Sequence, residues 1–153
     1  MKRIILYVVI LCSILFLPLK SMEIANLEPV QAVWMYEEDG KLVLETDTED
    51  KGTGGNVEEA LADMKQKSPG IIYLDTAQYL LVSEKVQPQI AALQAYVKGS
   101  VRLCQWDGQS DLVDAVKYAD AHKVGEKLKE WNPNVKLPKL PPINQSKKGE
   151  IPP

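Results

Sequence analysis

Histidine and cysteine are nearly absent from this sequence, and their scarcity limits the chemistry that the chain can perform. Among its 153 residues there are one histidine, His122, and two cysteines, Cys12 and Cys104. A catalytic triad or a cysteine–histidine pair would have to use His122, whose neighbours are ordinary helix residues. One histidine and one cysteine beyond the first apolar run supply neither the usual zinc ligands nor a disulfide framework. We therefore expect a protein that is not an enzyme and that has no catalytic, cofactor-binding or metal-binding residues.

Basic residues are also scarce beyond the first 21 positions. Lys2, Arg3 and Lys20 are three of the 18 lysines and arginines, so residues 22–153 carry 15 bases against 21 acids. This excess of acid disfavours a nucleic-acid partner. The length, with 45% hydrophobic and 25% charged residues, is typical of one globular domain with appendages.

A long apolar run occurs at the N-terminus. Lys2 and Arg3 precede an apolar stretch at residues 4–19, an order typical of an export signal. The stretch is shorter than a typical span of about 20 residues, and small residues suited to cleavage are few, so residues 1–21 are either a signal peptide or a signal anchor. Both alternatives place the remainder outside the cytoplasm. We expect it on the extracytoplasmic face of the cell membrane, held through residues 4–19, or secreted if the signal is cleaved.

Turn and cap signals predict a hairpin followed by a helix. Asp39-Gly40 separates two alternating runs, residues 29–36 and 41–46, and predicts an antiparallel hairpin. Asn56 is expected to cap a helix that ends near Lys67, with Glu59 reaching back to the cap. The polar, glycine-rich residues between the second strand and this helix indicate a mobile loop.

The second half of the chain predicts further strands and helices. We expect two buried strands at residues 71–74 and 79–82, a helix of about three turns after Pro88, a strand at residues 100–106, a helix capped by Ser110, and a short helical stretch ending at Trp131. This order predicts an α/β (α+β) fold with one mixed β-sheet of about five strands and helices packed over it.

The domain is expected to comprise residues 22–131. Residues 132–153 contain six of the ten prolines and almost no periodic apolar pattern, which predicts an extended tail. We expect this tail to dock as an accessory contact rather than to form part of the core, so that its removal leaves stability almost unchanged.

Four features of the sequence could indicate a functional site, and each also has a simpler structural explanation. The glycines of Gly52-Thr-Gly-Gly55 precede a helix, as in a phosphate cradle, but no Lys-Ser/Thr pair follows and Glu58 and Glu59 already bring negative charge. A flexible connection is the preferred interpretation. The acids of the run from Glu45 to Asp50 lack the pattern of a calcium loop and indicate a solvated loop, with weak cation binding as the alternative.

The remaining two features are the lone exported cysteine and the tryptophans. Cys104 alternates with Arg102 and Trp106 in an expected strand, which predicts a buried, structural thiol. The three tryptophans, at positions 34, 106 and 131, are expected to pack in the core rather than to form a binding platform.

With these elements in place, the chain resembles the N-terminal domain of the Ger(x)C family, the C subunits of bacterial spore-germination receptors. The resemblance lies in the glycine-rich loop, the helix start Asn56-Val-Glu-Glu-Ala-Leu61, the tyrosine-containing strands that end in Leu80-Leu-Val-Ser-Glu84, and the strand Val101-Arg-Leu103. It covers about residues 28–120.

This resemblance implies a function in spore germination. It suggests a non-enzymatic, membrane-held extracytoplasmic subunit that works beside polytopic membrane protein subunits of a germination-receptor-like complex in a spore former. An exported small-ligand-binding domain unrelated to germination is the alternative, and an enzyme ranks third because of the lone histidine.

The N-terminal signal generates a prediction about topology. Protease added to intact protoplasts is expected to digest the chain beyond Ser21, since basic residues that precede an apolar run stay in the cytoplasm. The protein is expected in the membrane fraction of untreated cells. A full-length chain that is protected from protease, or that fractionates with the cytosol, would contradict this topology.

Overall fold

The computed structural model describes residues 27–143, so the expected export signal lies outside the described residues. The strands are β1 (Leu27–Pro29), β2 (Ala32–Glu38), β3 (Lys41–Thr46), β4 (Lys51–Gly54), β5 (Ile71–Tyr73), β6 (Tyr79–Val82), β7 (Arg102–Gln105) and β8 (Glu126–Lys127). The α-helices are α2 (Val57–Lys67), α3 (Ile90–Leu93) and α4 (Leu112–Ala121), and 3-10 helices cover Leu74–Thr76, Glu84–Gln89 and Leu128–Glu130. Within residues 27–143, no helix has the length and apolar character needed to cross a membrane.

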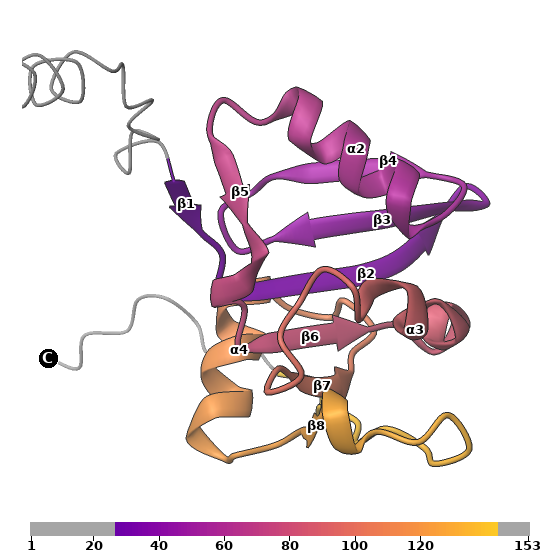
Figure 1. Ribbon diagram of the computed structural model, residues 1–153. Coiled ribbons are helices and arrows are strands. Elements are labelled where there is room, and N and C mark those ends of the chain that lie inside the picture. The colour runs from indigo at the N-terminus through magenta and orange to yellow at the C-terminus, as the bar shows by residue number, and fades with distance from the viewer. Residues whose placement is uncertain (1–26, 144–153) are drawn as a thin grey trace, which may run out of the picture.

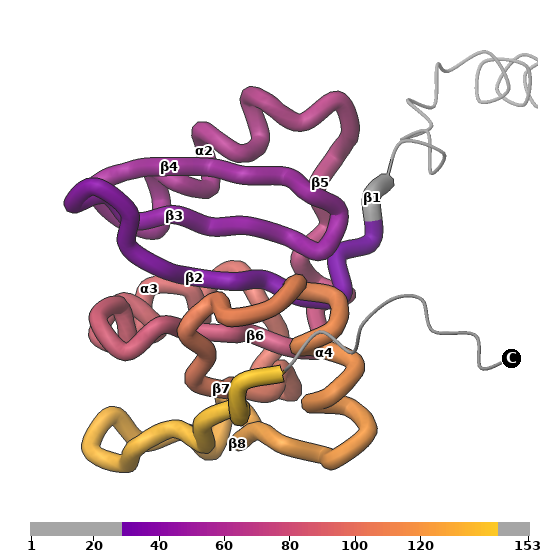
Figure 2. The backbone as a smooth tube through the Cα atoms, turned by 180° about the vertical axis from the view of Figure 1, so that it is seen from behind, coloured from indigo at the N-terminus to yellow at the C-terminus, as the bar shows by residue number. Residues whose placement is uncertain are grey.

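Six strands form one mixed sheet in the order β4-β3-β2-β6-β7-β8. The pairs β2·β6 and β6·β7 are parallel, whereas β2·β3, β3·β4 and β7·β8 are antiparallel. Helices α2 and α3 cover one face and α4 covers the other (Figures 1 and 2). The predicted α+β fold, with helices packed over one mixed sheet, is confirmed.

Alternation along the central strands divides the core between the two faces of the sheet. In β2, Val33 and Met35 join the cluster under α2 and α3, whereas Ala32 joins the cluster under α4 and Trp34 packs against it. In β6, all four residues are buried because both of its faces are covered. A continuous apolar run of this kind is typical of a parallel strand in the middle of a sheet.

The predicted hairpin and the predicted start of α2 are confirmed. Asp39 and Gly40 have φ values of 51° and 73°, the left-handed values that a tight two-residue turn requires, and they join Glu38 to its pairing partner Lys41. Asn56 caps α2 by accepting a hydrogen bond from the Glu59 N–H at 2.9 Å.

The prediction of a mobile loop before α2 was wrong, because Lys51–Gly54 form strand β4. Gly52 and Gly54 lie so close to α2 that an added Cβ would approach backbone atoms of Ala60 to 2.1 Å and 2.5 Å. These two glycines therefore allow the helix to pack directly on the strand. Glycine in sequence is typical of loops, whereas here it marks a close approach between two elements.

The strand predicted at residues 71–74 does not join the main sheet and is not fully buried. Residues 71–73 form β5, which pairs in parallel with β1 in a separate two-stranded sheet. Ile71 and Tyr73 remain 47% and 42% exposed, while Ile72 between them is buried. An apolar composition predicts burial on both sides of a strand, but this strand has one covered side and one side that is open to solvent.

Three helix predictions also need correction. The helix expected after Pro88 is only α3, since Pro88 lies inside the preceding 3-10 helix. Asp111 rather than Ser110 caps α4, with its Oδ1 accepting from the Val113 N–H at 2.8 Å. The stretch expected to be helical before Trp131 is β8 followed by a 3-10 helix.

The expectation that the tail lies outside the core was wrong. Leu137 and Leu140 are each 2% exposed and belong to the two core clusters. Strand β8 pairs only with Arg102 and Leu103, so the rest of the β7 edge is covered by the tail. There the Gln105 N–H donates to the Pro138 carbonyl and the Leu140 N–H donates to the Gln105 carbonyl, both at 2.9 Å. These bonds satisfy polar backbone groups that would otherwise be buried without partners.

Truncating a buried leucine of the tail tests its place in the core. Leu137→Ala is expected to lower the free energy of unfolding by about 2–4 kcal/mol, because the lost side chain leaves a cavity. For a domain of this size each kcal/mol lowers the melting temperature by about 4–8 °C. The matched control is Val135→Ala, since Val135 is 50% exposed. Equal melting temperatures for the two variants would show that the tail does not contribute to the core.

Candidate functional site

The glycine-rich segment before α2 does not form an anion site. The Gly55 N–H, which a bound phosphate would need, donates instead to Oε2 of Glu59 at 2.8 Å. The Asn56 side-chain amide donates to the other oxygen of the same carboxylate at 3.2 Å. Glu59 therefore already occupies the position at the start of the helix that an anion would take.

Cys104 and His122 lie in different environments. Cys104 is fully buried in β7, as predicted, and its Sγ–H contacts the Val124 carbonyl at 3.6 Å. Burial raises the pKa of its thiol to about 12, with Arg102 opposing this shift. His122 is exposed at the end of α4, with Nδ1 2.9 Å from the Tyr118 carbonyl and its ring stacked on the ring of Tyr118. Within residues 27–143, no hydrogen bond joins the side chains of Cys104 and His122.

The acidic run after β3 forms an ordered turn. Asp47 Oδ1 accepts hydrogen bonds from the N–H groups of Gln31 and Ala32 at 3.0 Å and 3.1 Å, which anchors the turn to the start of β2. Thr48 donates to Asp50 at 2.9 Å. Among residues 27–143, no group of three or more His, Cys, Asp or Glu side chains is arranged to hold a metal ion.

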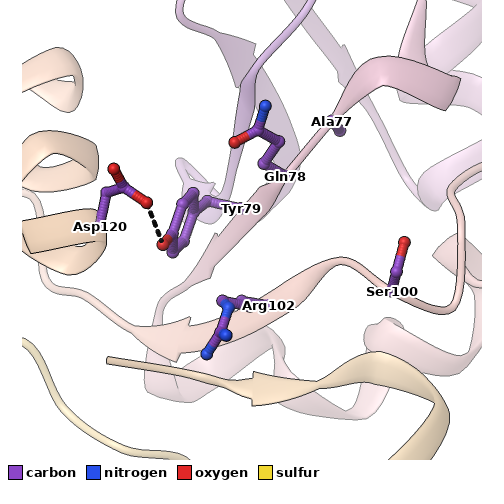
Figure 3. Close-up of a pocket in the computed structure, with 6 residues that line it drawn as sticks. All are labelled: Ala77, Gln78, Tyr79, Ser100, Arg102 and Asp120. Carbon is purple, nitrogen blue, oxygen red and sulfur yellow. Dashed lines mark hydrogen bonds between the residues drawn. The ribbon is translucent and has the colours of Figure 1, made fainter. Parts of the chain in front are cut away.

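One polar pocket opens at the amino-terminal ends of β6 and β7. It has a volume of about 230 Å³ and is lined by Ala77, Gln78, Tyr79, Ser100, Arg102 and Asp120. Figure 3 shows Asp120 and Arg102 reaching it from α4 and β7. Tyr79 donates to Asp120 Oδ1 at 3.1 Å, and burial together with this carboxylate raises the pKa of the phenol. The pocket therefore offers a cation, an anion and a buried phenol to a small polar molecule.

Sequence reasoning did not find this pocket. Tyr79 and Arg102 are opposite each other in the register of two parallel strands, and Asp120 comes from a helix that follows later in the chain. The sequence indicates only that Arg102 is a strand residue that alternates with Cys104. The signal that could have indicated the pocket is the presence of polar side chains at the first positions of two neighbouring strands.

A second hollow lies beside the tryptophans, between the acidic turn and the start of α4. Its volume is about 260 Å³, and its lining includes Trp34, Trp106, Glu45, Asp47, Glu49 and Asp111. The Trp34 ring is 4.7 Å from Trp106 and 3.9 Å from Tyr36, centroid to centroid. Trp106 is 2% exposed and Trp131 packs against the opposite core cluster, so the predicted core packing of these two is confirmed. Trp34 is half-buried and is one of the residues that line the hollow.

Comparison of the chain with models of protein families, with curated proteins and with solved structures found no match. These comparisons identify no family. The resemblance to the Ger(x)C family therefore stays a prediction that rests on motifs. In the structure those motifs are the capped start of α2 and the strands β6 and β7.

Cys104 provides a test of the geometry described above. In a Cys12→Ser background, a thiol reagent at neutral pH is expected to leave the folded chain unlabelled and to label it after unfolding, because the thiol is buried and protonated. Cys104→Ala is expected to cost on the order of 1 kcal/mol of stability. Rapid labelling of the folded chain would show that the thiol is open to solvent.

The raised pKa of Cys104 also predicts a loss of stability in alkali. The thiol titrates near pH 9.0 when unfolded and near 12 when folded, so its stabilising effect is complete below pH 9.0 and is lost as the pH rises towards 12. Chemical denaturation at pH 7 and pH 10 measures this effect. The Cys104→Ala variant, which lacks the group, is expected to lose less stability between these two pH values than the parent chain does.

Proposed function

We propose that this chain is an extracytoplasmic, membrane-associated subunit that acts by binding proteins rather than by catalysis. In this proposal it resembles the first domain of a spore-germination receptor C subunit, and its partners are polytopic membrane subunits. The proposal combines the N-terminal signal and the Ger(x)C-like motifs of the sequence with one surface of the fold.

The two-stranded ribbon β1·β5 is the observation that carries this proposal. Its strand β5 exposes Ile71 and Tyr73, which are two of the four large hydrophobic residues that are exposed among the described ones. They lie on one side of the strand, with buried Ile72 between them, and the ribbon lies at the edge of the fold (Figure 1). An aliphatic side chain beside a tyrosine offers the apolar contact that protein interfaces use at their centres.

The position of this ribbon in the chain favours a partner in the membrane. Residues 20–26 separate the apolar stretch from Leu27, where β1 begins. An extended chain covers at most about 3.5 Å per residue, so seven residues reach roughly 25 Å. If residues 4–19 are inserted in the membrane, β1 and β5 are therefore held close to its outer surface. A polytopic subunit in the same membrane can then cover Ile71 and Tyr73.

The second candidate function is that of an exported domain that binds a small ligand. The pocket formed by Tyr79, Arg102 and Asp120 favours it, because a cation and an anion in one hollow can hold both ends of a zwitterion. Parallel sheets commonly bind ligands at the carboxyl ends of their strands, whereas this pocket lies at the amino-terminal ends of β6 and β7. We therefore rank small-ligand binding below protein binding.

Photo-crosslinking from the ribbon tests the proposed partner. A benzophenone amino acid at Ile71 is expected to form an adduct, in membranes of the source organism, with a protein that mass spectrometry identifies as having several membrane spans. The matched control is the same substitution at Val135, which is 50% exposed compared with 47% for Ile71. It belongs to the yellow segment after the last 3-10 helix, which Figure 1 shows on the opposite side of the molecule from β1 and β5.

A substitution at the same surface provides a second measurement. Tyr73→Ala is expected to weaken the complex by about tenfold and to leave the melting temperature unchanged, because the tyrosine is exposed and aromatic side chains at interfaces commonly contribute this much. Adducts with lipid alone, or equal adducts from Ile71 and Val135, would reject a protein partner at the ribbon.

A further inference from the structure

The polar pocket at the amino-terminal ends of β6 and β7 contains a cation and an anion that do not pair with each other. Arg102 and Asp120 both line it, and neither takes part in an ion pair within residues 27–143. Among the same residues, the guanidinium of Arg102 makes one long hydrogen bond, from Nη1 to the Gly125 carbonyl at 3.4 Å. One molecule that carries both a negative and a positive group can therefore neutralise both side chains.

The surroundings of Arg102 favour an anionic ligand. Arg102 is half-buried and lies directly opposite Lys127 in the β7·β8 pairing, so two positive side chains share one side of the sheet. Like charges in this position are destabilising, and the Lys127 ammonium group is 3.8 Å from the carboxylate of Glu130, too far to neutralise Arg102 as well. A guanidinium can bind a phosphate through two parallel N–H···O bonds. A phosphate at Arg102 therefore offsets the repulsion.

Tyr79 and Asp120 form the other side of the pocket. Tyr79 is only 3% exposed, and its hydroxyl donates to Oδ1 of Asp120 at 3.1 Å (Figure 3). This hydrogen bond holds the carboxylate at the pocket. The second oxygen, Oδ2, accepts no hydrogen bond from the residues that the structure describes. A primary ammonium group has three N–H donors and can give one to this oxygen.

The size of the pocket suits one polar group of a larger molecule. Pockets that enclose a whole drug-sized ligand usually have volumes of about 300–1,000 Å³. This pocket has about 230 Å³, and three of the residues that line it, Gln78, Ser100 and Asp120, are exposed. A molecule that is bound by its polar end can therefore extend its remaining atoms beyond the rim.

The pocket lies at the end of the sheet where the ribbon β1·β5 joins it. Gln31, between β1 and β2, accepts hydrogen bonds from the N–H groups of Gln78 and Tyr79 at 2.8 Å and 3.2 Å. Figure 1 shows β1, β5 and the start of β6 on one side of the molecule. Residues 20–26 reach roughly 25 Å at most. If residues 4–19 are inserted in the membrane, as the proposed function assumes, the pocket is therefore held near the lipid headgroups.

We infer that this pocket binds the headgroup of a phospholipid that carries a phosphate and a primary ammonium group, as phosphatidylethanolamine does. The guanidinium of Arg102 binds the phosphate, and the free oxygen of Asp120 accepts a hydrogen bond from the ammonium group. The acyl chains stay in the membrane. This inference rests on the proposed membrane association, and it adds a lipid contact to the protein contact of the ribbon.

Native mass spectrometry of the full chain in a maltoside detergent tests the inference, because it counts the lipids bound to each protein molecule. Phosphatidylethanolamine is expected to bind about tenfold more tightly than phosphatidylcholine, whose trimethylated nitrogen has no N–H donor. It is also expected to bind about tenfold more tightly than phosphatidylglycerol, which has no ammonium group. Lipids that adhere to residues 4–19 do so in every variant, so differences between variants report the pocket.

Two variants of the pocket and two matched controls locate the binding. Arg102→Gln is expected to weaken phosphatidylethanolamine binding by about tenfold, and Asp120→Asn is expected to reduce its preference over phosphatidylcholine to less than about twofold. Asp114→Asn on the same helix and Lys98→Gln shortly before β7 remove the same charges outside the pocket and are expected to leave binding unchanged. Asp120 is exposed, so its variant stays informative if Arg102→Gln does not fold.

Three results would overturn the inference. These are equal binding of the three phospholipids, equal losses in the pocket variants and their controls, and saturation by soluble glycerophosphoethanolamine without any lipid binding. The last result would assign the pocket to a soluble ligand with the same phosphate and ammonium groups. Because the measurement is made in detergent, its failure would leave the protease and crosslinking tests of the proposed function unaffected.

Discussion

The parallel pairing of β2, β6 and β7 is the constraint on which the rest of this structure depends. Strand β6 lies between the other two and is buried at every position, so both of its faces need a covering layer. Helices α2 and α3 supply one layer and α4 supplies the other. The parallel direction also requires long connections, and the segment between β2 and β6 contains β3, β4, α2 and β5.

The two edges of the sheet are protected in different ways. At one edge, Gly52 and Gly54 let α2 lie directly against β4. At the other, β8 covers the first half of β7 and the tail covers Gln105. The β1·β5 ribbon is the contrasting case, because it keeps Ile71 and Tyr73 open to solvent. A fold that covers its main edges but leaves this ribbon open is consistent with the proposed binding role of the ribbon.

The hollow beside the tryptophans arises from the same architecture. Trp34 in β2 and Trp106 after β7 reach the α4 side of the sheet because alternation places them there, and Gly108 turns the chain closely around the Trp34 ring. The acidic turn follows β3 and is anchored to the start of β2 by Asp47. Each segment is ordered for a structural reason, and together they concentrate carboxylates next to aromatic rings.

The sequence by itself determined the local elements: the hairpin at Asp39-Gly40, the cap at Asn56, the strand around Cys104 and the class of fold. Turn, cap and alternation signals act between residues that are near each other in the chain, so they can be interpreted without a structure. Only the tertiary structure decided that Gly52 belongs to a strand and that Leu137 belongs to the core. It also decided which side chains share a hollow, because strand register and helix packing bring together residues that no local pattern connects.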